Sequence, residues 1–169
     1  WPTSCPVAVT DTTFGDEENL YATLFLGNKG FFVTFMQTDP FHAFEIDDAG
    51  NATEKTAYII SGWNDFFKPA FDNTRIVGTG TNNGTLAISL YDTNLDTLSP
   101  FIDRVEITEG WASSEAQWDD RAFTVLDNAT KVLNSDGAEE TGLVLLPFTG
   151  WNYNKGTEES GVKILTFSP

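Results

Sequence analysis

The chain contains very few of the residue types on which many reactive sites depend. Among its 169 residues there is one cysteine, one histidine and one methionine. The single cysteine, Cys5, cannot form an internal disulfide, so it is either an unpaired thiol or a candidate for an intermolecular disulfide between two copies. One histidine and one cysteine cannot supply the ligands that zinc and other transition metals need. A disulfide scaffold and a transition-metal centre are therefore excluded.

Positive charge is also scarce. The chain has 9 lysines and arginines against 25 acidic residues, which gives a formal net charge of −16. A surface of this charge repels nucleic acid and anionic membranes. No stretch approaches the roughly 18 consecutive apolar residues of a membrane span. We expect neither nucleic acid nor a membrane span among the partners of this protein.

Helical periodicity is missing, and strand-like runs take its place. Residues 20–26 and 31–36 flank the turn formers of 27–30, which predicts a β-hairpin. The other predicted strands are 42–46, 56–61, 85–91, 104–108, 122–126, 143–148 and 162–167. The spacing predicts an all-β fold, an antiparallel β-sandwich or a related β fold, with residues 1–169 as a single domain.

Three Asn-x-Thr triplets begin at Asn51, Asn83 and Asn128, each beside Asp, Asn or Gly. Such triplets accept glycans when a chain passes through a secretory pathway. The first residue is Trp1 and no apolar signal-like stretch precedes the strands, which is typical of a mature secreted chain. We therefore expect an extracellular glycoprotein with sugars at these three asparagines.

Three segments in order resemble the farnesoic acid O-methyltransferase-like domain of invertebrate secreted proteins. They are residues 32–44, residues 57–65 with Gly62-Trp63-Asn64, and residues 105–118 with Gly110-Trp111 and a second tryptophan, Trp118. The resemblance covers about residues 20–120, and residues 121–169 are expected to add C-terminal strands to the same domain. It implies that Trp111 and Trp118 form a buried structural pair that closes the fold.

The resemblance does not imply methyl transfer. The sequence has no glycine-rich strand–turn–helix unit that could hold an adenosyl cofactor, so its cofactors remain unknown and methyltransferase activity is not expected. His42 is the one histidine, and no Gly-x-Ser-x-Gly elbow is present to build a hydrolase triad. The chain is interpreted as non-enzymatic.

The sequence contains candidates for two kinds of oxygen-based site. Asp92, Asn94 and Asp96 begin with the alternation of a calcium loop, although Thr97 replaces the glycine that its turn needs. Paired carboxylates for glycoside hydrolysis are the other alternative, and acids on or beside strands are the candidates: Glu45, Glu106 and Glu109.

Aromatic residues are abundant, with 14 Phe, 5 Trp and 4 Tyr. Loop segments that join aromatic rings to amides and carboxylates favour a glycan ligand; they contain Trp63, Asn64, Asp65, Trp151, Asn152 and Tyr153. The phenylalanine excess favours a small apolar ligand such as an isoprenoid or a carotenoid-type pigment, held by a Phe-lined site that includes Phe31 and Phe67. An extracellular structural or interaction protein, with Cys5 as the candidate link between copies in an oligomer, is the third class. The sequence leaves these alternatives open.

Overall fold

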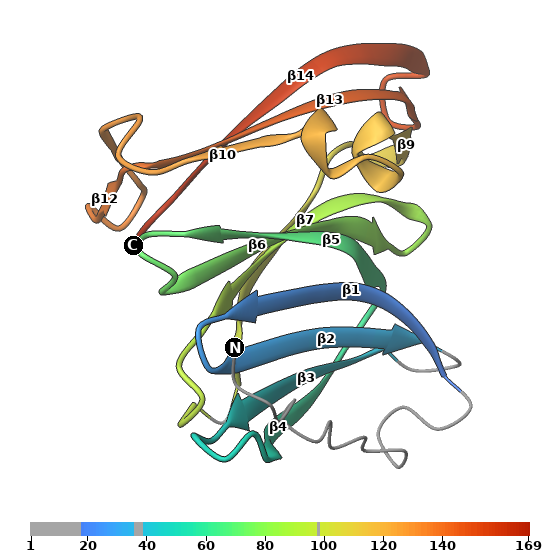
Figure 1. The fold of residues 1–169 in the computed structure, drawn as a ribbon. Coiled ribbons are helices and arrows are strands. Elements are labelled where there is room, and N and C mark those ends of the chain that lie inside the picture. The colour runs from blue at the N-terminus through green and yellow to red at the C-terminus, as the bar shows by residue number, and fades with distance from the viewer. Residues whose placement is uncertain (1–17, 36–38, 98) are drawn as a thin grey trace.

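A computed structural model describes residues 18–35, 39–97 and 99–169, so Cys5 lies outside the described residues. Nearly all of the regular structure in this part of the chain is β, and every strand pairing is antiparallel. The predicted all-β class is confirmed. The strands form three principal sheets that are stacked face to face (Figure 1).

The first sheet is a meander of four strands: β1 (Asn19–Leu26), β2 (Lys29–Phe35), β3 (Asp39–Ile46) and β4 (Ala52–Ile60). The predicted hairpin forms between β1 and β2. The inward face of the sheet carries Ala22, Phe31 and Phe41, which are buried against the second sheet. Alternate residues of these strands point to the opposite, outer face.

The second sheet repeats this meander with β5 (Trp63–Ala70), β6 (Arg75–Asn82), β7 (Thr85–Asp92) and β8 (Phe101–Glu106). Asn83 and Gly84 join β6 to β7 with positive φ angles of 49° and 78°. Positive φ at both central residues defines a type I′ turn, whose twist matches that of the flanking strands. An Asn-Gly pair at this point therefore fixes the register of the hairpin.

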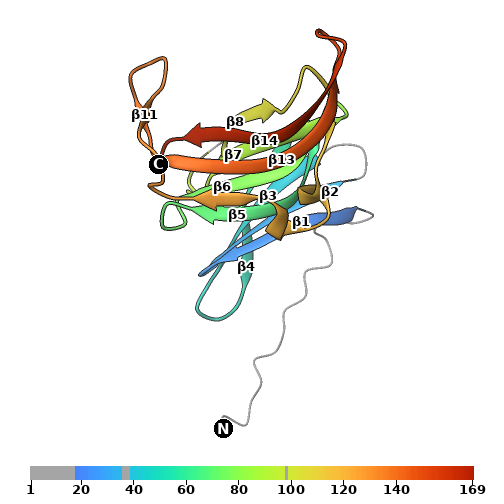
Figure 2. The same ribbon diagram turned by 90° about the horizontal axis from the view of Figure 1, so that it is seen from above.

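The third sheet is built differently. β13 (Gly142–Asn152) pairs with β14 (Thr157–Phe167) along its whole length, and on its other side with β9 (Gly110–Ser113) and β10 (Thr124–Leu126). Two short 3-10 helices, η1 (Glu115–Gln117) and η2 (Asp120–Ala122), separate β9 from β10. The first strand of this sheet is thus interrupted. A separate hairpin of β11 (Val132–Leu133) and β12 (Glu139–Glu140) projects from the stack (Figure 2).

Two apolar cores hold the stack together. Between the first and second sheets, the rings of Phe41 and Tyr91 stack with centroids 4.6 Å apart, and Phe67 meets both edge-on. Between the second and third sheets, Val77, Leu86, Ile88, Val144 and Leu146 are buried together with Phe123. Each fully buried side chain of this size contributes about 1.5–3 kcal/mol. The second sheet is consequently covered on both faces.

Glycines allow two paired strands to approach closely within the second sheet and again within the third sheet. A Cβ atom on Gly62 would lie 2.0 Å from the carbonyl oxygen of Thr81, and one on Gly80 would lie 1.9 Å from that of Trp63. In the third sheet, a Cβ on Gly110 would lie 2.2 Å from the carbonyl oxygen of Trp151, and one on Gly150 would lie 2.2 Å from the carbonyl oxygen of Trp111. Gly62-Trp63 and Gly110-Trp111 are therefore equivalent positions in consecutive sheets.

Candidate functional site

The candidate site lies where the first strands of the first and second sheets run beside each other. β5 lies between β1 and β10 and contacts both (Figure 1). The ring of Tyr21 on β1 lies 6.3 Å from the ring of Trp63 on β5. The indole nitrogen of Trp63 donates a hydrogen bond of 3.1 Å to Oδ1 of Asp65. Two aromatic rings and one carboxylate are thus held together at this point.

Local backbone irregularities position two of these three side chains. The β1–β2 register shifts between Leu20 and Ala22, and the β5–β6 register shifts between Asn64 and Phe66. Tyr21 and Asp65 are the extra residues at these shifts. A β-bulge releases its extra residue from the alternation of the strand and turns its side chain in a new direction, and bulges are common beside functional sites.

The carboxyl group of Asp65 has a raised pKa. Burial raises its pKa to about 6, while the hydrogen bond from Trp63 acts in the opposite direction. Its second oxygen, Oδ2, is buried and has no hydrogen-bond partner among the described residues. A carboxyl with one unsatisfied oxygen and a raised pKa is a candidate for binding or for proton exchange.

A second aromatic group lies on the third sheet. Trp111 and Trp151 are register partners on β9 and β13, so their side chains share the outer face of the sheet. They are 50% and 45% exposed, and Tyr153 in the following turn is 69% exposed. This group is more accessible than Trp63, which is half-buried.

Four of the side chains that the sequence suggested as ligand contacts are structural. Asn64 is 1% exposed and donates to the hydroxyl of Tyr91 over 2.6 Å, while Asn152 is buried and organises the β13–β14 turn. Phe31 and Phe67 are both buried in the core between the first two sheets. Phe67 and its neighbour Phe66 are both covered because the second sheet is packed on both faces.

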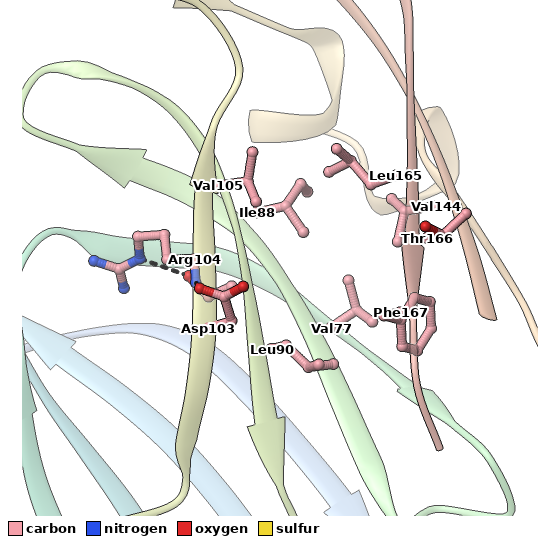
Figure 3. Close-up of a pocket in the computed structure, with 11 residues that line it drawn as sticks. Val77, Ile88, Leu90, Asp103, Arg104, Val105, Val144, Leu165, Thr166 and Phe167 are labelled. Carbon is pink, nitrogen blue, oxygen red and sulfur yellow. Dashed lines mark hydrogen bonds between the residues drawn. The ribbon is translucent and has the colours of Figure 1, made fainter. Parts of the chain in front are cut away.

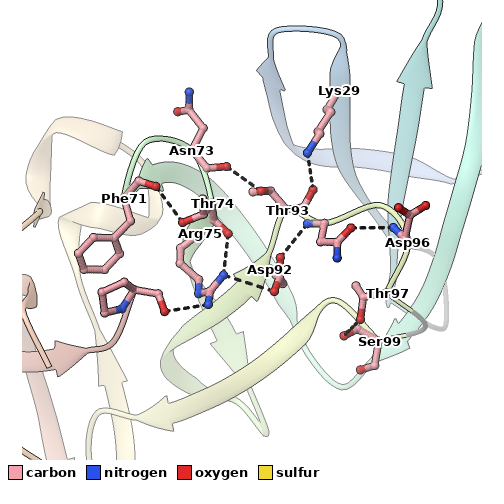
Figure 4. A network of polar contacts seen from close by, with 12 residues as sticks. Lys29, Phe71, Asn73, Thr74, Arg75, Asp92, Thr93, Asp96, Thr97 and Ser99 are labelled. Carbon is pink, nitrogen blue, oxygen red and sulfur yellow. Dashed lines mark hydrogen bonds and ion pairs between the residues drawn. The ribbon is translucent and has the colours of Figure 1, made fainter. Parts of the chain in front are cut away.

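The calcium candidates have other tasks (Figure 4). Oδ1 of Asp92 accepts from the backbone nitrogen of Asn94, and Oδ1 of Asn94 accepts from that of Asp96, so two of these side chains cap turns. Oδ2 of Asp92 also lies 3.3 Å from Nη1 of Arg75. No group of three metal-ligating side chains occurs among the described residues.

The outer rim of the second sheet borders two hollows. One, of about 60 Å³ and mostly apolar, lies between Val77 and Ile88 of the second sheet and Val144 and Phe167 of the third (Figure 3). The other, of about 500 Å³, is open and polar. The polar side chains around it form hydrogen bonds with one another. Arg104 donates to Ser61, Asn82 and Ser89, while Asn82 and Asn83 donate to Glu106.

The two tryptophans that were expected to be buried are exposed. Trp118 lies just after η1 and is 70% exposed, and Trp111 is half exposed on the outer face of the third sheet. The prediction of a buried closing pair is wrong. The ring that fills the core near them is Phe123, which is 1% exposed and lies under the ammonium group of Lys68.

Asn51, Asn83 and Asn128 are all exposed. Asn83 and Asn128 have positive φ angles of 49° and 50°, a conformation that asparagine tolerates better than most residues. Turn geometry by itself therefore accounts for asparagine at two of the three triplets, and glycosylation remains a prediction.

Sequence reasoning missed Tyr21. It lies inside a predicted strand, and nothing in its neighbours indicates that the register shifts there. Asp65 was found because it follows Gly-Trp-Asn. This segment alone does not show that Tyr21 on β1 lies beside Trp63 on β5.

Stacked antiparallel sheets whose first strands lie together are the blades of a β-propeller. The chain belongs to the family described as beta propeller domain, whose model matches residues 8–167. This match overturns the resemblance to the farnesoic acid O-methyltransferase-like domain. The Gly-Trp pairs that suggested it are explained by the close approach of neighbouring strands in two successive blades.

The curated relatives carry no assigned function. An uncharacterized protein of Archaeoglobus fulgidus is 32% identical over 99 residues, 59% of this chain and 16% of the relative. Uncharacterized protein MJ1554 of Methanocaldococcus jannaschii is 23% identical over 138 residues, 70% of this chain and 22% of the relative. The chain thus spans less than a quarter of the length of either.

Among solved structures, a protein from Lactobacillus plantarum matches with a TM-score of 0.40 and 10% identity, over 88% of this chain and 59% of the other. A likeness at this level supports no argument. Within residues 18–35, 39–97 and 99–169, no helix has the length and apolar character to cross a membrane.

Proposed function

We propose that this chain is a non-enzymatic binding module whose ligand is a glycan or another hydroxyl-rich molecule, held at Tyr21, Trp63 and Asp65. The observation that carries the proposal is the unsatisfied Oδ2 of Asp65 beside two aromatic rings. A sugar hydroxyl would donate to this carboxylate once the side chains that cover Oδ2 move aside, and the C–H face of the sugar ring would pack on an aromatic ring. The hydrogen bond is stronger to the ionised carboxylate, which favours binding above pH 6.

The apolar alternative has less support. The Phe31 and Phe67 side chains proposed for an isoprenoid or pigment are packed in a core, and the apolar hollow between the second and third sheets measures about 60 Å³. Pockets for ligands of drug size are about 300–1,000 Å³. An apolar carrier of this kind would require the sheets to separate.

Glycoside hydrolysis would require a second carboxyl group about 5–10 Å from Asp65. Of the acids suggested by the sequence, Glu45 is paired with Lys55 and Glu106 accepts from two asparagines. These contacts favour structural roles for both, and binding without chemistry remains the proposal.

We also propose export and glycosylation, supported by the exposure of Asn51, Asn83 and Asn128. Intact mass of chain secreted from a eukaryotic host, before and after glycosidase treatment, tests this. An unchanged mass would remove the argument for a glycoprotein. Non-reducing gels of the same material test whether Cys5 links two chains.

A glycan array followed by tryptophan-fluorescence titration of each hit tests the binding site. Asp65→Asn should weaken binding by about tenfold or more, equivalent to about 1.4 kcal/mol. Trp63→Phe should shift the affinity in the same direction. Trp118→Phe is the matched control, because Trp118 is exposed and belongs to another part of the fold. Equal affinity of Asp65→Asn and the native chain would place the ligand elsewhere.

A further inference from the structure

The open polar hollow beside the second sheet is bordered by an arginine that has no acidic partner among the described residues. The other two arginines each form an ion pair with an aspartate. The guanidinium of Arg104 instead donates to neutral oxygens, those of Ser61, Asn82 and Ser89. It points away from the small apolar hollow (Figure 3), and its buried Nη2 has no hydrogen-bond partner in the described part of the chain. Because a partly buried charge without a counter-charge is costly, a negative group bound beside Arg104 would be stabilising.

A carboxylate is held close to this guanidinium without pairing with it. Glu106 lies two residues after Arg104 on β8, so both side chains are on the same face of the strand. The carboxamide of Asn82 lies between them: its oxygen accepts from Nη1 of Arg104 over 3.0 Å, and its nitrogen donates to Oε1 of Glu106 over 2.7 Å. Asn83 donates to the same Oε1, so these two bonds orient the carboxylate and do not involve Oε2. Opposite charges are thus fixed on either side of one amide group.

The space around these charges is large enough for a small molecule. The hollow has a volume of about 500 Å³ and is also lined by Phe101 and by Glu109 in the segment after β8. The guanidinium of Arg104 lies 5.5 Å from the centre of the Phe101 ring. A second hollow, of about 210 Å³, shares Phe101 and Arg104 with the first and reaches Tyr58 on β4. Arg104 therefore borders a space that has acidic groups at one end and aromatic residues at the other.

We infer that this hollow binds a small zwitterion of the α-amino-acid type. The ligand carboxylate would approach Nη1 of Arg104, where it would replace the Ser61 hydroxyl, which lies 3.3 Å from that nitrogen. The ligand ammonium would lie between the carboxylates of Glu106 and Glu109, which border the same hollow. A zwitterion fits better than a simple anion, because it has no net charge and the acidic surface does not repel it. These residues differ from those of the proposed glycan site, so the inference does not rest on the proposed function.

Isothermal titration calorimetry of the native chain with each of the common L-α-amino acids tests the inference. We expect binding of at least one amino acid with an apolar side chain. Its N-acetyl derivative lacks the ammonium charge and its methyl ester lacks the carboxylate charge, so each should bind about tenfold more weakly than the parent. Binding of none of the amino acids would overturn the inference. A derivative that binds as tightly as its parent would also contradict it, because the site would then recognise only one charge.

Two variants locate the binding site. Arg104→Gln removes the guanidinium charge and Glu109→Gln removes one carboxylate, and each should weaken binding by about tenfold. Glu109 is exposed, so its variant keeps the test decisive if circular dichroism shows that Arg104→Gln does not fold. Glu158→Gln is the matched control, because it makes the same change of charge at an exposed position on β14, in another sheet, and should bind as the native chain does. Native affinity in Glu109→Gln, or an equal loss in Glu158→Gln, would contradict the placement of the ligand.

Discussion

The indole nitrogen of Trp63 and the carboxylate of Asp65 are joined by a hydrogen bond of 3.1 Å across a β-bulge. The bond satisfies only one carboxylate oxygen. Asp65 is thus retained in a place where its charged form is destabilised, which is a cost to folding at neutral pH.

Replacing Asp65 by Asn should stabilise the protein at neutral pH. Burial raises the pKa of Asp65 from 3.8 to about 6, so between these values the native state holds a proton that the unfolded state has released. Native stability therefore falls as pH rises through this window and stays lower above it. Because the side chain is partly exposed, we expect a gain of only about 1–2 kcal/mol for Asp65→Asn at pH 7. Urea unfolding of both proteins between pH 3.5 and 7.5 measures the difference; a difference that does not change with pH would contradict the raised pKa.

Adding a methyl group at Gly80 should be strongly destabilising. The new Cβ would lie 1.9 Å from the carbonyl oxygen of Trp63 and 2.6 Å from the Cα of Asn64, and neither backbone atom can move without disturbing the pairing of β5 and β6. We expect Gly80→Ala to cost about 3 kcal/mol. Gly161→Ala is the matched control, because nothing lies within 4 Å of its Cβ position on β14. Thermal unfolding of both variants measures the contrast, and similar melting temperatures would refute the close approach.

The two large rings near η1 and η2 should differ in their effect on stability. Phe123 is 1% exposed and Trp118 is 70% exposed. Phe123→Ala should cost about 3–5 kcal/mol through loss of apolar burial and the cavity that remains. Trp118→Ala should change stability by less than about 1 kcal/mol. Denaturant unfolding measures both losses of stability. A larger loss for Trp118→Ala than for Phe123→Ala would restore the structural role that the sequence predicted for Trp118.

The turn at Asn83 should accept glycine better than alanine. Its φ of 49° strains a residue with a Cβ, and asparagine tolerates this conformation better than alanine does. Asn83→Ala should be about 1 kcal/mol less stable than Asn83→Gly, because glycine adopts this φ without strain. Both variants lose the hydrogen bond to Glu106, so their difference isolates the backbone effect. Equal losses in chemical denaturation would mean that the hydrogen bond, and not the turn, requires asparagine.

The fold class could be predicted because strand propensity and turn residues act locally. The alternation of residues 20–26 and 31–36 around 27–30 was sufficient for the first hairpin. The stacking of three sheets could not be inferred in this way, because it depends on which faces meet. Phe66 and Phe67 illustrate the difficulty: adjacent apolar residues are expected at one buried and one exposed position, but the second sheet is covered on both sides.

The candidate site was predicted in part for a similar reason. Trp63 and Asp65 share a segment, so their association was visible in the sequence. Tyr21 lies 42 positions from Trp63, and only the packing of the first strands of two sheets brings it there. Asn64 and Asn152 were misassigned as ligand contacts because a polar side chain on a probable loop looks the same in sequence whether it binds a ligand or supports the fold.

The glycines that open the second and third sheets, Gly62 and Gly110, are 48 positions apart. Because the neighbouring strand leaves no space for a side chain at either position, substitution there should be selected against regardless of the ligand. We expect a similar distance between the starts of any further blades in the much longer archaeal relatives, and their sequences can be inspected for it. In these sequences, a glycine followed by an aromatic residue would mark where each blade begins, even where the strands between have lost all recognisable similarity.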